Sequence, residues 1–309
     1  MLDHRSNAHI IRLGSVALLA LASLVISPRA GAQDLIIDGT SQTLGGTHTY
    51  DSVQVINGGI LYVETYDGDP STTGTLRIIA DSIEVDATSY IIADGSGYRA
   101  DLNALAGMGE GDGGGQGGSY VIDGAGGGAY GADGGDGVRD YWQLGGCALD
   151  GQGGVENGDD DTFEIDMGSA GGSGGSGDGD GWGGGGDGAG AIWLEADVLT
   201  IAGTVRTNGG AAGVFLNDSG GGGAGGGILL WTASANITGT LQAIGGVGHY
   251  YDDGGGGGSG GRVKVFYMDG TVSPTVDVAG TVGGNNSYCG SFMTGGDGSS
   301  FSVDTDTDD

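Results

Sequence analysis

Basic residues are scarce in this sequence. It contains nine Lys and Arg against 40 Asp and Glu, which gives a formal net charge of −31. Such a surface repels nucleic acid and anionic lipid, because both are negatively charged. We therefore expect no nucleic acid as a partner. The same acidity favours solubility and supplies oxygen ligands for divalent cations.

Cysteine is also rare, with only Cys147 and Cys289. Two cysteines are too few for a disulfide framework, and no Cys-x-x-Cys or Cys/His spacing indicates a zinc site. In an oxidising compartment the two are candidates for one disulfide. The sequence does not show that they meet, so the pairing is left open.

Long apolar runs are missing after the first 32 residues. Before that point, Arg5 and Arg12 precede an apolar stretch at 13–26, and residues 30–32 read Ala-Gly-Ala. This pattern predicts a secretory signal peptide cleaved before Gln33, with a short membrane anchor as the alternative. We expect a mature protein without a transmembrane helix that is exported and lies outside the cell or on its outer surface.

Helical periodicity is absent from the mature chain, and short β-rich segments take its place. The first of them are 35–37, 52–56 and 59–63. A repeated unit then pairs a first apolar strand with a shorter second one. The first strands are expected at 76–80, 192–196, 228–231 and 263–267, and the second strands at 90–93, 204–207 and 240–243, with a weaker copy at 281–282.

The spacing of these units predicts a solenoid. The last three first strands begin 36 and 35 residues apart, and each of the two complete units has 13 residues between equivalent positions of its strands. A fixed period of this size indicates coils that bury their apolar faces against one another. We therefore predict an all-β fold, a right-handed parallel β-helix. Ile192 and Leu194 are expected to stack on their equivalents in the next two coils.

Glycine accounts for 77 of the 309 residues, and many occur in runs. Two interpretations are open for the long glycine-rich insertion at 95–190: a flexible loop, or extended strands packed side by side as in polyglycine II. We favour order for the runs at 220–227 and 254–261, which adjoin strands, and less order for 145–181. The chain is thus divided into a signal peptide (1–32), a glycine-rich β-helix domain (33–303) and an acidic tail (304–309).

The alternation of glycine run, apolar strand and a second strand such as Gly239-Thr240-Leu241-Gln242-Ala243 resembles the glycine-rich β-helical repeat proteins that bacteria export, many of them adhesin-like surface proteins. The resemblance covers residues 34 to about 303. It implies a protein that acts through its shape, with an extracellular glycan or a surface component as the partner. It carries over no catalytic residue. The glycine runs also resemble polyglycine antifreeze bundles, although Thr204, Thr207 and Thr240 are few for an ice-binding face.

Calcium is the candidate ligand, because acidic loops in an exported protein offer hard oxygen ligands. The weak candidates are Asp304, Asp306 and Asp308, which alternate like the start of a calcium loop but lack its glycine and its final glutamate. The alternative interpretation is a solvated acidic tail. No cofactor is predicted to be required.

Polysaccharide cleavage is the alternative function. Asp252-Asp253 and the pair Arg262 and Lys264 are similar to elements of pectin-hydrolysing β-helices. However, Lys264 alternates with apolar residues as a surface position would, and an anionic protein repels polyuronides. No Gly-x-Ser-x-Gly elbow or phosphate-binding loop is present, and His48 and His249 are expected in surface loops. Trp142, Trp182 and Tyr250-Tyr251 are candidates for sugar stacking or for packing over glycine. The sequence predicts a structural or adhesin-like protein and no catalytic residue.

Overall fold

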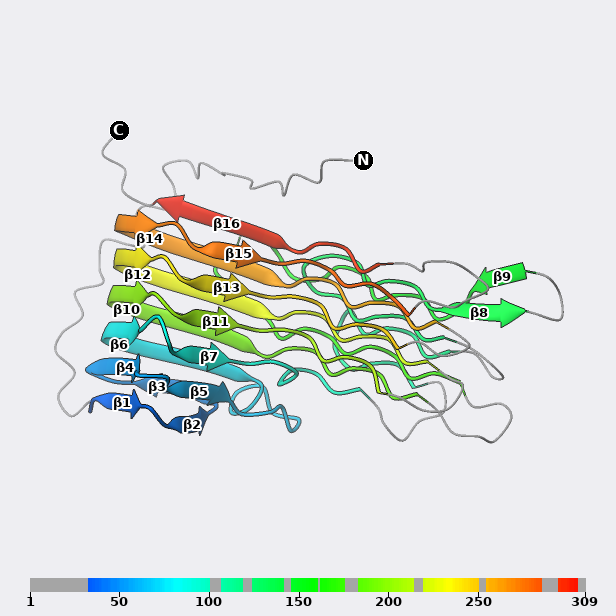
Figure 1. Ribbon diagram of the computed structural model, residues 1–309, viewed down its shortest axis with the longest axis horizontal. Helices are drawn as coiled ribbons and strands as arrows, with labels where there is room; N and C mark the ends of the chain where they lie inside the picture. Colours follow the sequence, from blue (N-terminus) through cyan, green and yellow to red (C-terminus); the bar gives the residue numbers. More distant parts are fainter. Residues whose placement is uncertain are drawn as a thin grey trace.

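The computed structural model describes residues 33–100, 107–118, 124–141, 146–160, 162–175, 183–213, 219–249, 254–284 and 294–304. The predicted signal peptide, 1–32, lies outside the described residues. The described chain is built from β-strands and glycine-rich segments. Figure 1 shows the strands stacked in chain order at one end of the molecule, with the glycine-rich segments continuing toward the other end.

Two parallel sheets form the β-helical part, which confirms the predicted parallel β-helix. In the larger sheet, β3 (Gly46–Thr49) also pairs with β6 (Thr75–Val85), beside β4 (Ser52–Ile56). The order of the larger sheet is β1 (Leu35–Asp38), β4 (Ser52–Ile56), β6 (Thr75–Val85), β10 (Ala191–Ile201), β12 (Gly227–Ile237), β14 (Arg262–Val272) and β16 (Ser299–Asp304).

The smaller sheet repeats the same order with shorter strands. Its residues alternate between the core and the outer surface, and the inward residues Leu61, Ile91, Val205 and Leu241 are fully buried. The order is β2 (Ser41–Leu44), β5 (Ile60–Val63), β7 (Tyr90–Ile92), β11 (Thr204–Arg206), β13 (Thr240–Gln242) and β15 (Thr275–Asp277). One strand from each sheet therefore makes one coil.

The predicted stacking register is confirmed. Ile192 pairs with Ile228, which pairs with Val263, and Leu194 begins an equivalent row one pleat further on. These side chains lie in one continuous apolar core. Like residues stack because each coil buries its apolar face only against the coils above and below it.

The first strands are longer than predicted, at 11 residues in β6, β10, β12 and β14. In β10, Asp197 and Val198 are both exposed, and the buried positions resume at Leu199. The alternation therefore shifts by one residue, which moves the following side chains to the opposite face of the strand. The strand turns at this point and still keeps apolar residues in the core. Uniform period-two alternation predicts that the strand ends at this shift, which is why the predicted first strands are too short.

The glycine-rich runs form an ordered bundle, which confirms the packed interpretation for the described residues. Backbone N–H groups in the run that precedes β12 donate to three neighbouring segments in turn, and each segment recurs as the acceptor at every third residue. A period of three is that of the polyglycine II conformation. The donors are Gly221, Ala224 and Gly227 to 166–172, Gly222 and Gly225 to 254–261, and Gly223 and Gly226 to 207–213.

Three further segments donate to the carbonyl groups of the same run, namely 125–131, 186–189 and 243–249. The run is therefore surrounded by six hydrogen-bonded neighbours, three of which come from the insertion at 95–190. Such close approach requires glycine: a Cβ at Gly222 would overlap the carbonyl oxygen of Gly246. Within 145–181, for which less order was expected, the stretches 150–154 and 168–174 are hydrogen-bonded into the bundle like the runs beside the strands. An antiparallel pair, β8 (Val138–Tyr141) and β9 (Gly146–Leu149), lies at the far end of the bundle in Figure 1.

Candidate functional site

The most concentrated polar network lies where the last glycine strand becomes β14. Arg262 is the first residue of β14, and its exposed fraction is only 1 %. Its register partner in the previous coil is Gly227. The sequence thus places a long cation in a row where the neighbouring coil has no side chain, and that cation needs partners because an unpaired buried charge is costly.

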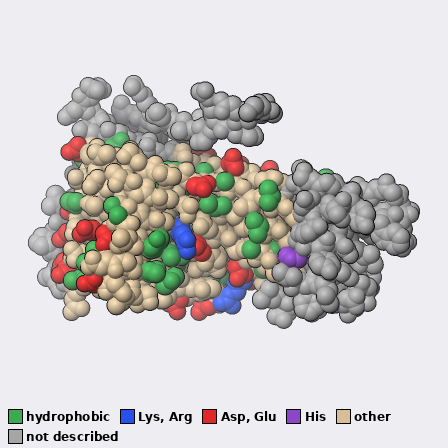
Figure 2. All heavy atoms as spheres, in the orientation of Figure 1, with side chains coloured by type: hydrophobic (Ala, Val, Ile, Leu, Met, Phe, Trp, Pro, Cys, Tyr) green, Lys and Arg blue, Asp and Glu red, His purple; other side chains and the backbone are tan. Residues whose placement is uncertain are grey.

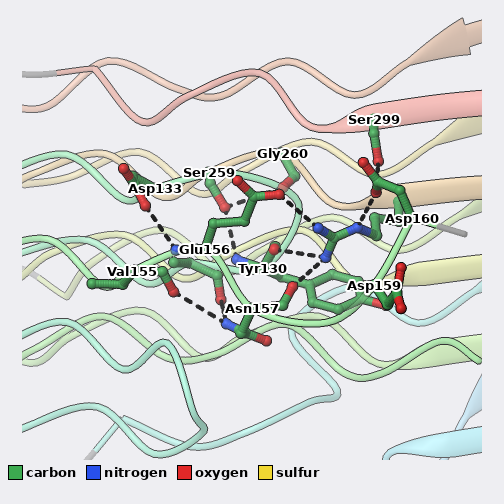
Figure 3. A network of polar contacts seen from close by, with 12 residues as sticks. Tyr130, Asp133, Val155, Glu156, Asn157, Asp159, Asp160, Ser259, Gly260 and Ser299 are labelled. Carbon is green, nitrogen blue, oxygen red and sulfur yellow. Dashed lines mark hydrogen bonds and ion pairs between the residues drawn. The ribbon is translucent and has the colours of Figure 1, made fainter. Parts of the chain in front are cut away.

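Each nitrogen of the Arg262 guanidinium donates to an acceptor on the protein (Figure 3). Nε donates to Asp160 Oδ1 at 2.6 Å and Nη2 to Glu156 Oε1 at 2.8 Å. Nη1 donates to the backbone carbonyls of Tyr130, at 2.9 Å, and Asn157. The guanidinium carbon also lies 5.0 Å from the centre of the Tyr130 ring. The site therefore satisfies the buried charge through two carboxylates, two carbonyls and one aromatic face.

Lys264 continues the same role two residues along β14. Its exposed fraction is 0 %, and its ammonium group donates to the carbonyls of Asp159, Thr162 and Glu164 at 2.5, 2.9 and 2.9 Å. The expectation of a surface position is therefore wrong. Lys264 does point away from the core, but a segment of the insertion lies over it.

That segment, residues 156–160 and 162–166, is called here the covering segment. Between Thr162 and Glu164, whose carbonyls accept from Lys264, Phe163 packs against Trp231 and Phe266 on the outer face of the larger sheet, with ring centres 5.1 and 4.5 Å away. The residues of the covering segment that bind Arg262 and Lys264 lie about 100 positions before them in the chain. The network fastens the insertion to the β-helix.

The titration of the network follows from its burial and charge. Burial raises the pKa of Tyr130 to about 12, so its hydroxyl stays protonated; this oxygen accepts a hydrogen bond from the backbone N–H of Asp166. For Asp160, burial acts to raise the pKa, but hydrogen bonds from Arg262 and Ser299 outweigh it and hold the pKa below its usual value. Asp160 is therefore ionised at neutral pH and pairs with the buried cation.

The cations of this network are not placed as catalytic groups. A general base or an electrophile must reach a substrate, whereas Arg262 and Lys264 are buried and direct their N–H groups at protein acceptors. Asp252 and Asp253, the acids of the pectin-type interpretation, lie outside the described residues. His249 ends the segment 243–249, where burial lowers its pKa.

The expectation of a surface loop for His48 is wrong. His48 is in β3, in register with the core residue Ile78, so its side chain lies on the core face at the first coil. It stacks on Tyr50, with ring centres 6.1 Å apart, and its Nε2 is 2.8 Å from the carbonyl oxygen of Gly45. Both aromatic rings close the open end of the core, a role that alternation within 46–49 would have indicated.

Most of the remaining predicted site residues lie outside the described part of the chain. Asp304 ends β16, while Asp306 and Asp308 lie outside the described residues. Cys147 is in β9 and Cys289 is outside the described part, so the disulfide stays a prediction. The stacking candidates Trp142, Trp182, Tyr250 and Tyr251 are likewise outside it. Of the three threonines considered for ice, Thr204 and Thr240 align on the outer face of the smaller sheet, and Thr207 is buried.

Among the described residues, no group of three or more His, Cys, Asp or Glu side chains is arranged to hold a metal ion. Across those same residues, no helix has the length and apolar character needed to cross a membrane.

The sequence-based search missed Tyr130, Glu156 and Asp160, the partners of Arg262. A signal was present, because two cations occupy rows that are glycine and leucine in the preceding coil, and such cations need carboxylates from elsewhere. The chain matches no family model, no curated protein and no solved structure. The β-solenoid architecture is therefore established by the sheet topology and register alone.

Proposed function

We propose that the mature chain is a secreted or cell-surface structural protein of a bacterium, adhesin-like, that displays a rigid and acidic β-solenoid. The observation that carries the proposal is the continuous connection between the β-helical sheets and the glycine-rich bundle. The chain passes from β11 and β13 into the glycine bundle and returns from it to β12 and β14, and the run at 220–227 is hydrogen-bonded to six neighbours there. Such a body resists bending, because few backbone groups are free to change partners.

The charges of the described residues support a structural role. The buried cations Arg262 and Lys264 hold the covering segment, and Arg206, at the end of the central strand β11, forms an ion pair with Asp94. The likeness to exported glycine-rich β-helical proteins supports the same location and role. Calcium is the proposed stabilising ion for the acidic surface, since its preferred ligands are carboxylate oxygens.

The alternative, a polysaccharide-cleaving enzyme, has less support. It would use Arg262 or Lys264 beside an acid, and both cations lie under the covering segment.

Protease treatment of intact producing cells tests the proposal. We expect brief exposure to proteinase K to release fragments of the protein from the cell pellet. Proteinase K is preferred to trypsin because only six Lys and Arg remain after residue 32. A cytoplasmic protein that stays intact serves as the control for lysis. Intact protein found only in the culture medium would overturn the surface assignment, and cleavage of polygalacturonate would then be assayed.

A further inference from the structure

The outer face of the smaller sheet carries two straight rows of side chains. The inward residues of the four central strands, Leu61, Ile91, Val205 and Leu241, are fully buried, so the residues on either side of them point outward. We call this surface the small-sheet face. Its first row is Ser41, Ile60, Tyr90, Thr204, Thr240 and Thr275, and its second row is Thr43, Tyr62, Ile92, Arg206, Gln242 and Asp277, of which Ile92 is buried.

Two tyrosines lie together at one end of this face. Tyr62 and Tyr90 are on the neighbouring strands β5 and β7, one in each row, and 39 % and 37 % of their surfaces are exposed. Figure 2 shows hydrophobic side chains gathered over this part of the sheet, next to a basic group. Each of these tyrosine side chains is therefore partly packed against its surroundings and partly exposed to solvent.

The small-sheet face is close to neutral, although the whole chain carries a formal charge of −31. The positive charge of Arg206 is compensated by Asp94, with Nε and Oδ2 2.8 Å apart. The other polar residues between the tyrosines and the last strand are Thr and Gln, which offer hydroxyl and amide groups. Asp277, on the last strand, accepts a hydrogen bond from the backbone N–H of Ala279. The face thus combines apolar rings with neutral hydrogen-bonding groups.

We propose that the small-sheet face binds a neutral polysaccharide chain. A pyranose ring has an apolar C–H face that packs on an aromatic ring, and hydroxyl groups at its edge that bond to hydroxyl and amide side chains. The face is two side chains wide and six strands long, about 24 Å at the usual strand spacing. That narrow strip suits a chain-like ligand. Acidic glycans are repelled by the surrounding charge.

This site rests on the proposed function in one respect, since it names the partner that an extracellular display protein would hold. Two substitutions test it with little risk to the fold. Tyr90→Thr continues the row of Thr204 and Thr240, and Tyr62→Thr places threonine beside its register partner Thr43. Threonine favours strands, so both variants should keep the unfolding temperature of the wild type. Met268→Ala, at an exposed residue of β14, is the matched control.

The experiment is native gel electrophoresis in gels that contain hydroxyethyl cellulose, dextran or polygalacturonate. We expect at least one neutral polymer to retard the wild-type protein and Met268→Ala equally, and polygalacturonate to retard neither. Each tyrosine variant should bind that neutral polymer about tenfold more weakly. Absence of retardation by both neutral polymers would overturn the site, and so would retardation that survives in both tyrosine variants. Either result leaves the outcome of the cell-surface protease experiment unaffected, so the two proposals fail separately.

Discussion

Gly222→Ala should destabilise the protein by about 3 kcal/mol or more, at the upper end of the range for overpacking. The added methyl group would overlap the carbonyl oxygen of Gly246, which is main chain and not a movable side chain. The run at 220–227 is held by six neighbours, so relieving the overlap displaces several strands together. The midpoint of urea unfolding measures the effect, with an unchanged slope as the sign that the folded state is otherwise intact.

Gly213→Ala is the matched control for this prediction. A Cβ at Gly213 would be 3.5 Å from the nearest atom, the carbonyl oxygen of Gly184, which is an ordinary contact. Here alanine should leave stability unchanged or raise it by about 0.5 kcal/mol, because it restricts the unfolded chain. Equal losses in the two variants would show that intrinsic preference for glycine, and not close packing in the bundle, sets the effect.

Arg262→Ala is the second large expected effect, with a loss of about 3 kcal/mol in the free energy of unfolding. It removes the cation to which Asp160 and Glu156 are bound. The value lies at the lower end for a broken buried pair, because these two carboxylates are about half exposed and can be rehydrated. Limited proteolysis should also cut the covering segment sooner than in the wild type, since one of its attachments is lost.

Arg77→Ala provides the comparison in the same sheet. Arg77 pairs with Glu195 at 2.7 Å, but 38 % of its side chain is exposed, and such pairs contribute less than about 1 kcal/mol. Its removal should leave the covering segment as resistant as in the wild type. If Arg262→Ala costs no more than Arg77→Ala, the network around Arg262 does not fasten the insertion.

The stacking of the coils was predictable from the sequence. Ile192, Ile228 and Val263 recur at a nearly constant spacing, and a parallel sheet aligns equivalent positions of a repeat. The turn within the long strands was not predictable from the sequence, because the side-chain alternation changes phase at Asp197 and Val198. A pattern search based on period two ends there.

The arrangement of the glycine bundle was harder to predict. Glycine has no side chain that encodes a partner, so the neighbours of 220–227 are determined by space and by hydrogen bonding along the whole chain. The partners of Arg262 are also about 100 residues away from it. The sequence indicated a surface position for Lys264, and only the fold shows that the insertion covers both Arg262 and Lys264.

Hydrogen–deuterium exchange over residues 219–227 tests the central claim most directly. If this run is a hydrogen-bonded strand inside a bundle, its amides should exchange as slowly as those of β12, which it precedes. Exchange at the rate of an unstructured peptide, while β12 stays protected, would contradict the account. The glycine runs would then be loose loops on a β-helix, and the rigidity proposed for the whole molecule would be lost.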